Sequence, residues 1–253
     1  MPGYESACVA GLEVHVFGAA ADKPVVLVTH GRGGHIGDTH GLCKRLAERG
    51  LVAVGVEQRN HGRRLVSHAA NDHSPTHAAD MYGLMVGTAT DLSLLLDFLP
   101  ARLGLSVQRV GVTGVSLGGH VTLMALGLDP RFTAGAAFIG SGDYLALMRQ
   151  RHLREEFRAL AWDEFYNPGL AAAVERFDPV NRPEVFADRP VLLLNGADDT
   201  LVPLEGNENL AEAVRPLYAQ PERFQQNVYQ GVGHEVTRAM EDDALEWLER
   251  WLK

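Results

Sequence analysis

Short apolar runs that alternate with segments of helical spacing are the feature that most restricts the fold of this chain. Five runs are apolar or nearly so, at residues 24–29, 51–56, 110–115, 132–139 and 191–194. Continuous apolar runs of this length predict strands covered on both faces, as in a parallel sheet. Segments with helical spacing lie between them at residues 39–49, 79–99 and 117–126, and Gly50 and Pro100 are expected to end the first two. The alternation predicts an α/β fold with a mostly parallel, doubly wound sheet.

Further elements are expected near the ends of the chain and in one long stretch without a strand. Strands are predicted at residues 14–17 and 224–229, and an amphipathic helix at residues 242–252. Within residues 141–186 a helical pattern runs from Tyr144 to Trp162 and prolines follow it. We expect this stretch to be a small helical insertion or lid within a single domain, residues 1–253.

Charge and composition limit the partners of the chain. Of its 253 residues 46% are hydrophobic, and 23 Lys+Arg against 32 Asp+Glu give 23 − 32 = −9. This acidic balance argues against nucleic acid and anionic membranes, which both attract cationic surfaces. No apolar stretch approaches the roughly 18 residues of a membrane span, and none has the form of a signal peptide. Cys8 and Cys43 are expected to be buried free thiols, which favours a cytoplasmic protein.

A serine motif lies where a predicted strand meets a predicted helix. Residues 114–118 read Gly-Val-Ser-Leu-Gly, and such a tight turn lifts Ser116 above the edge of the sheet. The glycines fit this geometry because side chains there would collide with the neighbouring strand and helix. The motif predicts a nucleophilic serine, although a glycine-rich turn with a helix-capping serine would use the same residues.

A serine hydroxyl needs a base beside it, and the base needs an acid that orients it. Asp198 and Asp199 follow the predicted strand 191–194, where a carboxylate can face the same sheet edge as Ser116. His234 lies in a glycine-flanked loop after the last predicted strand. Only one aspartate can reach His234, because adjacent side chains point in different directions. A histidine bonded only to its own turn is the structural alternative.

As a set, these motifs resemble the α/β-hydrolase superfamily, and they look closest to its serine carboxylesterases and dienelactone-hydrolase-like members. The resemblance covers nearly the whole chain through residues 30–34, 114–118, 196–203 and 233–234. It implies the α/β-hydrolase fold, no cofactor, and a triad of Ser116, His234 and Asp199, because the family pattern G-x-x-D-x-x-V-P selects Asp199. The chain departs from a dienelactone hydrolase proper at one position, where such an enzyme would have cysteine in place of Ser116.

The resemblance also implies where the oxyanion of the transition state would be stabilised. Two backbone N–H groups form the oxyanion hole in this family. Here they would belong to Leu117, directly after Ser116, and to Arg32, in the loop at residues 30–34.

Two further features lie near this loop in the sequence. The guanidinium of Arg32, with those of Arg63 and Arg64, is a candidate for binding an acidic group of the substrate. Residues 57–62 resemble a D-x-R-N-H-G stretch that shapes the loop beside the site in related esterases, with Glu57 in place of the aspartate.

Dinucleotide binding and metal binding are weaker alternatives. A G-x-G-x-x-G motif that began at Gly31 would need glycine at position 36, where the chain has isoleucine. Four histidines lie close together in the sequence, at positions 61, 68, 73 and 77. Pro75 disfavours a helix that would bring His73 and His77 onto one face, so we expect no metal site.

The expected function is the cleavage of small carboxylic esters through an acyl-enzyme on Ser116. Trp162, Phe165 and Tyr166 are candidates for lining the substrate pocket, although they could equally form the core of the insertion. Thioesterases, peptidases and acyltransferases can use the same triad, and the fold also permits a non-catalytic ligand-binding module. The expected partner is a small-molecule ester, without nucleic acid or membrane. A homodimer could form through an edge strand or the last helix.

Overall fold

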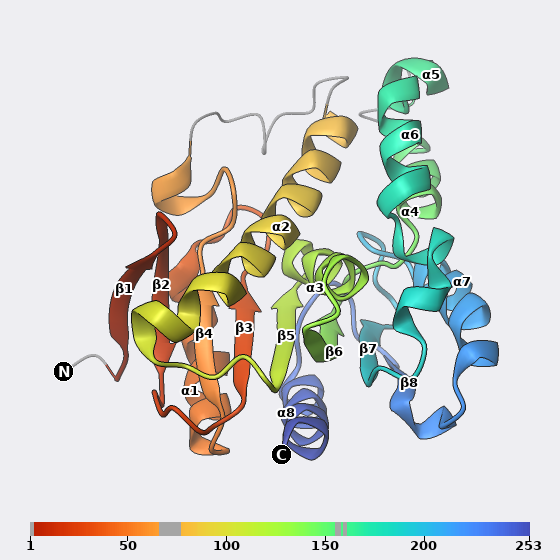
Figure 1. The fold of residues 1–253 in the computed structure, drawn as a ribbon. Helices are drawn as coiled ribbons and strands as arrows, with labels where there is room; N and C mark the ends of the chain where they lie inside the picture. Colours follow the sequence, from red (N-terminus) through yellow and green to blue (C-terminus); the bar gives the residue numbers. More distant parts are fainter. Residues whose placement is uncertain (1–2, 66–76, 155–157, 159–160) are drawn as a thin grey trace.

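An eight-stranded sheet forms the centre of the computed structural model, which describes residues 3–65, 77–154, 158 and 161–253 (Figure 1). In chain order the strands are β1 (Glu5–Val9), β2 (Leu12–Phe17), β3 (Val25–Thr29), β4 (Val52–Val56), β5 (Val110–Val115), β6 (Phe132–Phe138), β7 (Val191–Gly196) and β8 (Phe224–Tyr229). Their spatial order is β1-β2-β4-β3-β5-β6-β7-β8. β2 is antiparallel to both of its neighbours, and all pairs from β4 to β8 are parallel, which confirms the predicted mostly parallel sheet.

Helices cover both faces of the sheet, as a doubly wound fold requires. They are α1 (His40–Glu48), α2 (His77–Leu103), α3 (Leu117–Leu128), α4 (Tyr144–His152), α5 (Trp162–Phe165), α6 (Pro168–Phe177), α7 (Glu205–Val214) and α8 (Arg238–Leu252). α1 and α8 pack on one face, and α2 and α3 pack on the other (Figure 1).

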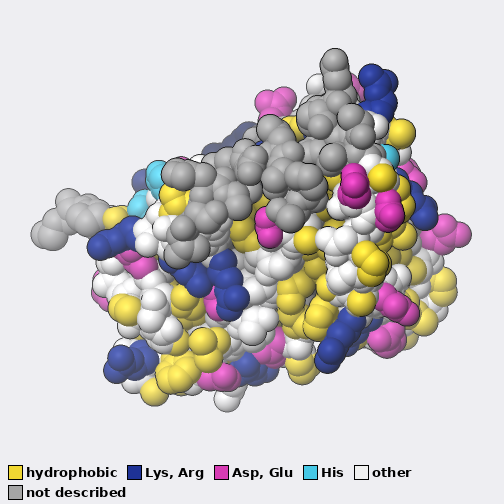
Figure 2. Space-filling model, turned by 90° about the horizontal axis from the view of Figure 1, so that it is seen from above, with side chains coloured by type: hydrophobic (Ala, Val, Ile, Leu, Met, Phe, Trp, Pro, Cys, Tyr) yellow, Lys and Arg dark blue, Asp and Glu magenta, His cyan; other side chains and the backbone are white. Residues whose placement is uncertain are grey.

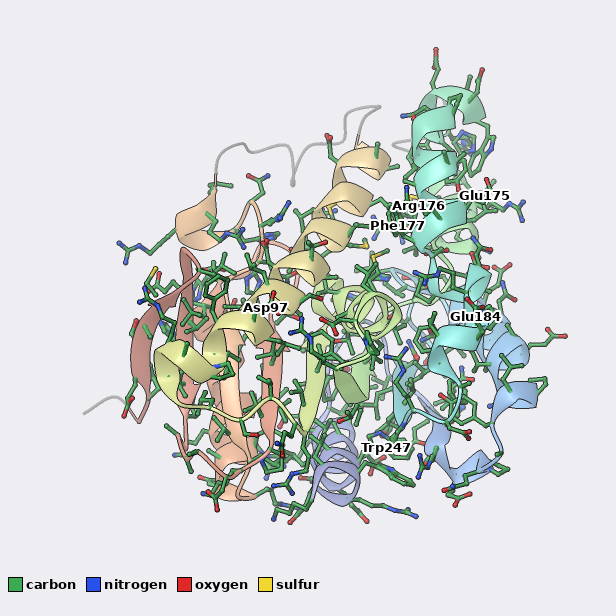
Figure 3. The ribbon with its side chains drawn as sticks, viewed as in Figure 1. Asp97, Glu175, Arg176, Phe177, Glu184 and Trp247 are labelled. Carbon is green, nitrogen blue, oxygen red and sulfur yellow. The ribbon has the colours of Figure 1, made fainter. Side chains whose placement is uncertain are left out.

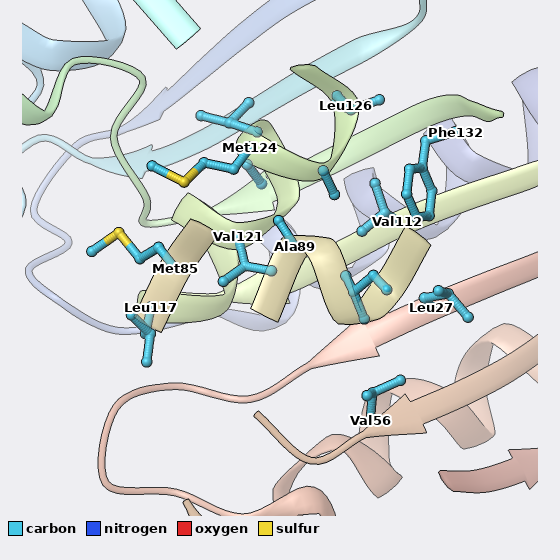
Figure 4. Close-up of a cluster of buried hydrophobic side chains, with 14 of the residues drawn as sticks. Leu27, Val56, Met85, Ala89, Val112, Leu117, Val121, Met124, Leu126 and Phe132 are labelled. Atoms are coloured by element: carbon cyan, nitrogen blue, oxygen red, sulfur yellow. The ribbon is translucent and has the colours of Figure 1, made fainter. Parts of the chain in front are cut away.

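The apolar runs contribute to two separate cores, because successive side chains of a strand point to opposite faces. Leu27 of β3 belongs to the core with α2 and α3, whereas Val26 and Val28 belong to the core with α1 and α8. Figure 4 shows part of the first core, where Met85 of α2 and Val121 of α3 lie over the strands. Both kinds of strand position are buried, which explains why the runs show no polar alternation.

Helix α2 does not end before Pro100, as expected from the sequence, but continues to Leu103. A proline inside a helix removes an N–H donor and crowds the carbonyl four residues earlier. The fold accommodates Pro100 because only three residues of α2 follow it. A bend at Pro100 would therefore displace only the last turn of the helix. Gly104, with a φ of 65°, then ends the helix in the left-handed conformation that glycine adopts readily.

Strand β1 is not predicted by the sequence analysis. It is an edge strand that pairs with β2, and most of its residues are exposed, so no run of apolar residues marks it. Cys8 lies in this strand and is exposed, which corrects the expectation of two buried thiols. Cys43 of α1 is fully buried, and this burial raises the pKa of its thiol to about 12.

The stretch between β6 and β7 contains α4, α5 and α6, which extend beyond the sheet at the upper right of Figure 1. The prediction of one helix from Tyr144 to Trp162 is wrong, because α4 ends at His152 and α5 begins only at Trp162. Residues 155–157 and 159–160 lie outside the described residues. The assignment of residues 141–186 to a lid stays a prediction.

The span Ala78–Leu103 of α2 is long and apolar enough to cross a membrane, with a mean hydropathy of 1.3 in its most apolar window. This differs from the expectation that no apolar stretch approaches the length of a membrane span, because Asp80, Asp91 and Asp97 divide the apolar residues of the helix. Half of that window is buried against the rest of the protein, as in the core helix of a globular fold. The expectation of no membrane partner stays a prediction.

The substitution Leu95→Ala is expected to lower the free energy of unfolding by about 2–5 kcal/mol, because truncation of a fully buried leucine leaves a cavity. The matched control is Leu94→Ala on the same helix, where the side chain is 39% exposed. It is expected to cost less than about 1 kcal/mol. Urea unfolding measures both values. Equal losses for the two variants would contradict the packing of α2 against the sheet.

Candidate active site

Ser116 lies at the sharp turn between β5 and α3. Its φ of 56° and ψ of −108° are rarely adopted by residues other than glycine. A Cβ atom on Gly114 would lie 2.6 Å from the Gly118 carbonyl oxygen, and one on Gly118 would lie 2.6 Å from the Thr29 carbonyl oxygen. Both glycines are therefore sterically required, as predicted. The Ser116 side chain does not cap α3, so the structure does not support the alternative of a capping serine.

Ser116, His234 and Asp199 are joined by hydrogen bonds. Ser116 Oγ lies 2.9 Å from His234 Nε2, and His234 Nδ1 lies 2.7 Å from Asp199 Oδ2. A carboxylate only accepts hydrogen bonds, so Nδ1 carries the proton and Nε2 can accept from the serine hydroxyl. The Asp199 side chain is fully buried, whereas that of His234 is 20% exposed and accessible to solvent.

The loop after β7 fixes the orientation of the acid. Asp199 Oδ1 accepts hydrogen bonds from the backbone N–H groups of Leu201 and Val202, both at 2.9 Å. Its other oxygen is thereby left to face His234. Asp198 is exposed instead. The structure thus brings Asp199, and not Asp198, against the histidine.

The backbones of Leu117 and Arg32 border the serine. Leu117 is the first residue of α3, where the N–H groups of the first turn lack acceptors within the helix. Gly31, directly before Arg32, lies against the turn, since a Cβ atom there would be 3.8 Å from Ser116 Cβ. Arg32 and Ser116 line the same cavity. These positions are compatible with two N–H donors for an oxyanion.

A buried histidine–glutamate pair supports the loop that carries Arg32. His30 Nδ1 donates to the Gly31 carbonyl at 2.8 Å, and His30 Nε2 donates to Glu57 Oε1 at 2.6 Å. Glu57 Oε2 accepts from the Ile36 N–H at 3.2 Å, so one carboxylate holds both ends of the loop. Burial alone would raise the pKa of Glu57. The hydrogen bonds from His30 and Ile36 outweigh burial and hold this pKa below its ordinary value of 4.5.

His61 holds the middle of the same loop. Its Nε2 accepts from the Gly33 N–H at 3.0 Å, and its Nδ1 donates to the Arg59 carbonyl at 2.8 Å. The ring is therefore neutral in this arrangement, and burial lowers its pKa. Residues 57–62 thus shape the loop beside the site, as the resemblance implies.

A second buried network, which the sequence analysis missed, holds the segment after β6. Asn207 Nδ2 of α7 donates to the Gly140 carbonyl at 2.9 Å and to Asn195 Oδ1 of β7 at 2.7 Å, and both asparagines are buried. The preceding residue, Ile139, has a φ of 43° and lines the cavity beside Ser116. The network therefore fixes a strained segment next to the nucleophile. Lone asparagines in a helix and a strand form no motif, so no sequence signal marks them.

His120 follows Ser116 by one turn of α3 but belongs to the interior. The Ser141 N–H donates to its Nδ1 at 3.0 Å. Burial lowers the pKa of His120 to about 4, so this ring is neutral near pH 7 and serves as a structural acceptor.

A cavity of about 410 Å³ opens at Ser116 and extends toward α1 and α8. Its lining includes the apolar residues Leu42, Phe138 and Ile139, together with the charged side chains of Arg32 and Glu235. The volume is in the range of roughly 300–1,000 Å³ that small-molecule sites occupy. Figure 2 shows basic and acidic side chains interspersed over the described part of the upper face, without a large patch of one sign.

The three aromatic pocket candidates lie in and directly after α5. Phe165 is fully buried, and the ring of Trp162 stacks on that of Tyr166 with centroids 5.2 Å apart. None of the three is among the described residues that line the cavity with Ser116. Packing within the insertion accounts for their positions, and a role in the pocket stays a prediction.

Arg63 and Arg64 each have an acidic partner within the protein. Arg64 Nη2 donates to Asp91 Oδ2 at 2.7 Å, and Arg63 Nε lies 3.7 Å from Glu13 Oε2. Burial and the nearby positive charge of Arg154 lower the pKa of Arg32. The cation near Arg32 is therefore Arg154, which was not among the arginines expected there.

Part of the histidine cluster considered for metal binding lies within the described residues. Within residues 3–65, 77–154, 158 and 161–253, no group of three or more His, Cys, Asp or Glu side chains could hold a metal ion. His61 belongs to the loop contacts above, and His68 and His73 lie outside the described residues. The expectation of no metal site stays a prediction.

Known proteins match this chain over most of its length. Residues 82–253 match the model of the prolyl oligopeptidase family. The chain belongs to the prolyl oligopeptidase family. It is 27% identical over 232 residues to "Putative esterase YitV" of Bacillus subtilis (strain 168). This alignment covers 90% of this chain and 89% of that protein. It is 25% identical over 209 residues to esterase YjfP of Escherichia coli (strain K12), which covers 82% of this chain and 80% of that protein.

The crystal structure of TT1662 from Thermus thermophilus has the same fold. It superposes with a TM-score of 0.80 at 29% sequence identity, covering 99% of this chain and 98% of that chain. The chain is therefore a hydrolase with the α/β-hydrolase fold, and the resemblance noted from its motifs is confirmed.

The substitution Glu57→Gln is expected to destabilise the protein by about 1.5–3 kcal/mol near neutral pH, because it weakens hydrogen bonds to a buried charge. The folded-state pKa of Glu57 lies below 4.5, so its contribution is fully present above pH 4.5 and is lost as pH falls through the lower value. Urea unfolding of both proteins between about pH 6 and about pH 3 should show the difference shrinking toward acid. A difference that stays constant with pH would contradict the lowered pKa of Glu57.

Proposed function

We propose that this protein is a serine esterase that cleaves small carboxylic esters through an acyl-enzyme. The observation that carries the proposal is the chain of hydrogen bonds from Ser116 through His234 to Asp199, at 2.9 and 2.7 Å. An isolated serine hydroxyl is a weak nucleophile near neutral pH, and a histidine base oriented by a carboxylate activates it.

In the first half-reaction Ser116 Oγ attacks the carbonyl carbon of the ester while His234 Nε2 accepts the hydroxyl proton. Asp199, bonded to Nδ1, stabilises the imidazolium that forms. The negative charge on the former carbonyl oxygen is stabilised by the N–H groups of Leu117 and Arg32. The tetrahedral intermediate collapses when the bond to the alcohol oxygen breaks and His234 donates its proton to that oxygen.

In the second half-reaction water releases the acid. His234 Nε2 accepts a proton from water as the water oxygen attacks the acyl-enzyme carbonyl. The same N–H groups stabilise the second oxyanion, and the proton returns to Ser116 Oγ as the carboxylic acid leaves. Every step uses groups of the chain and water, so the proposed reaction requires no cofactor.

A small ester is the proposed substrate for two reasons. The cavity at Ser116 has a volume of about 410 Å³, which suits a small molecule. YjfP, which aligns with this chain over most of the length of both proteins, is named an esterase.

Peptide bond cleavage is the second candidate, and the description of the matched family favours it. The same triad can cleave an amide, with His234 protonating the departing amine. We favour the ester because the two relatives compared above carry esterase names and align with more than three quarters of their own length.

Wild-type protein is expected to hydrolyse p-nitrophenyl esters, with the highest kcat/KM for short acyl chains in a series from acetate to decanoate. Ser116→Ala is expected to lower kcat/KM by at least about 10³-fold, because the nucleophile is lost. The matched control is Ser93→Ala on α2, which is expected to leave the rate unchanged. Release of p-nitrophenol measures all three proteins.

Aminoacyl p-nitroanilides separate the two candidate functions in the same assay. A kcat/KM higher for the anilides than for every ester would reject the esterase in favour of the peptidase. Ester hydrolysis that persists in Ser116→Ala would contradict the proposed nucleophile altogether.

A further inference from the structure

A second cavity, of about 600 Å³, lies between α2 and α6. It shares no described lining residue with the cavity at Ser116, and it lies toward the face of the sheet that α2 covers. Its lining is mainly apolar. Tyr82 and Val86 contribute from α2, and Leu170 and Phe177 contribute from α6. In Figure 3 Phe177 lies on the side of α6 that faces α2.

Small residues form part of the α2 wall of this cavity. Ala79, Gly83 and Gly87 line it at intervals of four residues, so they lie on one side of the helix. A Cβ atom on Gly83 would meet no atom within 4 Å, so packing among the described residues does not require glycine there. Glycine is also unfavourable inside a helix compared with alanine. Gly83 is exposed, so this part of the wall is open to solvent and leaves room for an apolar chain.

One end of the cavity carries positive charge. Arg59 Nε and Nη2 both donate to Asp91, at 2.9 and 2.7 Å, while Arg59 Nη1 lies toward Gly87 in the cavity wall. Arg64 Nη2 donates to the same carboxylate at 2.7 Å. Burial alone would raise the pKa of Asp91, but the bonds from both arginines hold it below its ordinary value. Two guanidinium groups therefore share one carboxylate, which leaves one positive charge in excess.

We propose that this cavity binds a free carboxylic acid with an apolar chain, its carboxylate against Arg59 Nη1 and its chain between α2 and α6. The apolar lining removes the surface of the chain from water. The excess positive charge attracts a carboxylate and repels a cationic head group. Ester hydrolysis releases the same class of molecule. The link between the bound acid and the reaction product rests on the proposed function. The proposed binding of the acid in this cavity does not.

Decanoate is the probe, with decanol as the neutral analogue and decyltrimethylammonium as the cationic one. Isothermal titration calorimetry on the full chain is expected to show saturable decanoate binding, at least about tenfold tighter than binding of either analogue. Undetectable decanoate binding below its micelle concentration would overturn the proposal, as would equal or tighter binding of the cation. Calorimetry does not depend on hydrolysis, so a failed esterase assay leaves this test intact.

Substitutions locate the bound acid. Gly83→Leu puts a side chain into the cavity and is expected to weaken decanoate binding at least about tenfold, with p-nitrophenyl acetate hydrolysis unchanged. The matched control is Ala101→Leu at an exposed position of the same helix, which is expected to bind decanoate as wild type does. Ala173→Leu fills the cavity from α6 and repeats the test if Gly83→Leu does not fold.

Arg59→Gln tests the charged end of the cavity. It is expected to weaken decanoate binding about tenfold and to change decanol binding less than about twofold, because only the acid uses the charge. Decanoate binding that is unchanged in a folded variant with a filled cavity would place the acid elsewhere, including at Ser116, and would overturn the proposal.

Discussion

The close approach of β3 to the turn after β5 is the constraint on which the site depends. Glycine at position 118 lets the backbone of Thr29 approach the turn, and glycine at position 114 leaves room for the Gly118 carbonyl. Ser116 lies between them in a backbone conformation that costs on the order of 1–3 kcal/mol. Packing of α3 against β5 and β6, and a 2.9 Å hydrogen bond from the Ser116 N–H to the Phe138 carbonyl, hold it there. The strain aims the hydroxyl at His234 before any substrate arrives.

Around this turn, buried polar groups set the positions of the loops. His30 and Glu57 are 27 residues apart and pair with almost no exposure, and Asn207 joins β7 to the segment after β6 in the same way. An unpaired charge in such a place would cost several kcal/mol, and an unpaired buried amide would also be costly, so each pair restricts its loop to the conformation in which the partners meet. The geometry at Ser116 is therefore specified by contacts between distant segments, and the two cores beneath supply the rigid support.

Much of the fold, and the residues at the sheet edge around Ser116, could be predicted from local sequence. The other elements could not, because they depend on contacts between distant segments or lack a local pattern. The parallel strands are apolar on both faces, and the turn at Ser116 has a motif, so both are visible in the sequence. Strand β1 is an exposed edge strand without an apolar pattern, and α2 passes through Pro100 because the proline lies near its end. The pairing of Asn195 with Asn207 arises only when β7 and α7 meet.

Covalent labelling with a fluorophosphonate tests the central claim most directly, namely that Ser116 is activated by His234 and Asp199. Mass spectrometry would locate the label and give its rate for wild type, Asp199→Asn and the matched control Asp198→Asn. The account predicts a label on Ser116, a rate at least about 100-fold lower in Asp199→Asn, and a rate within about threefold of wild type in Asp198→Asn. A label on another residue, or equal rates in the two variants, would contradict it.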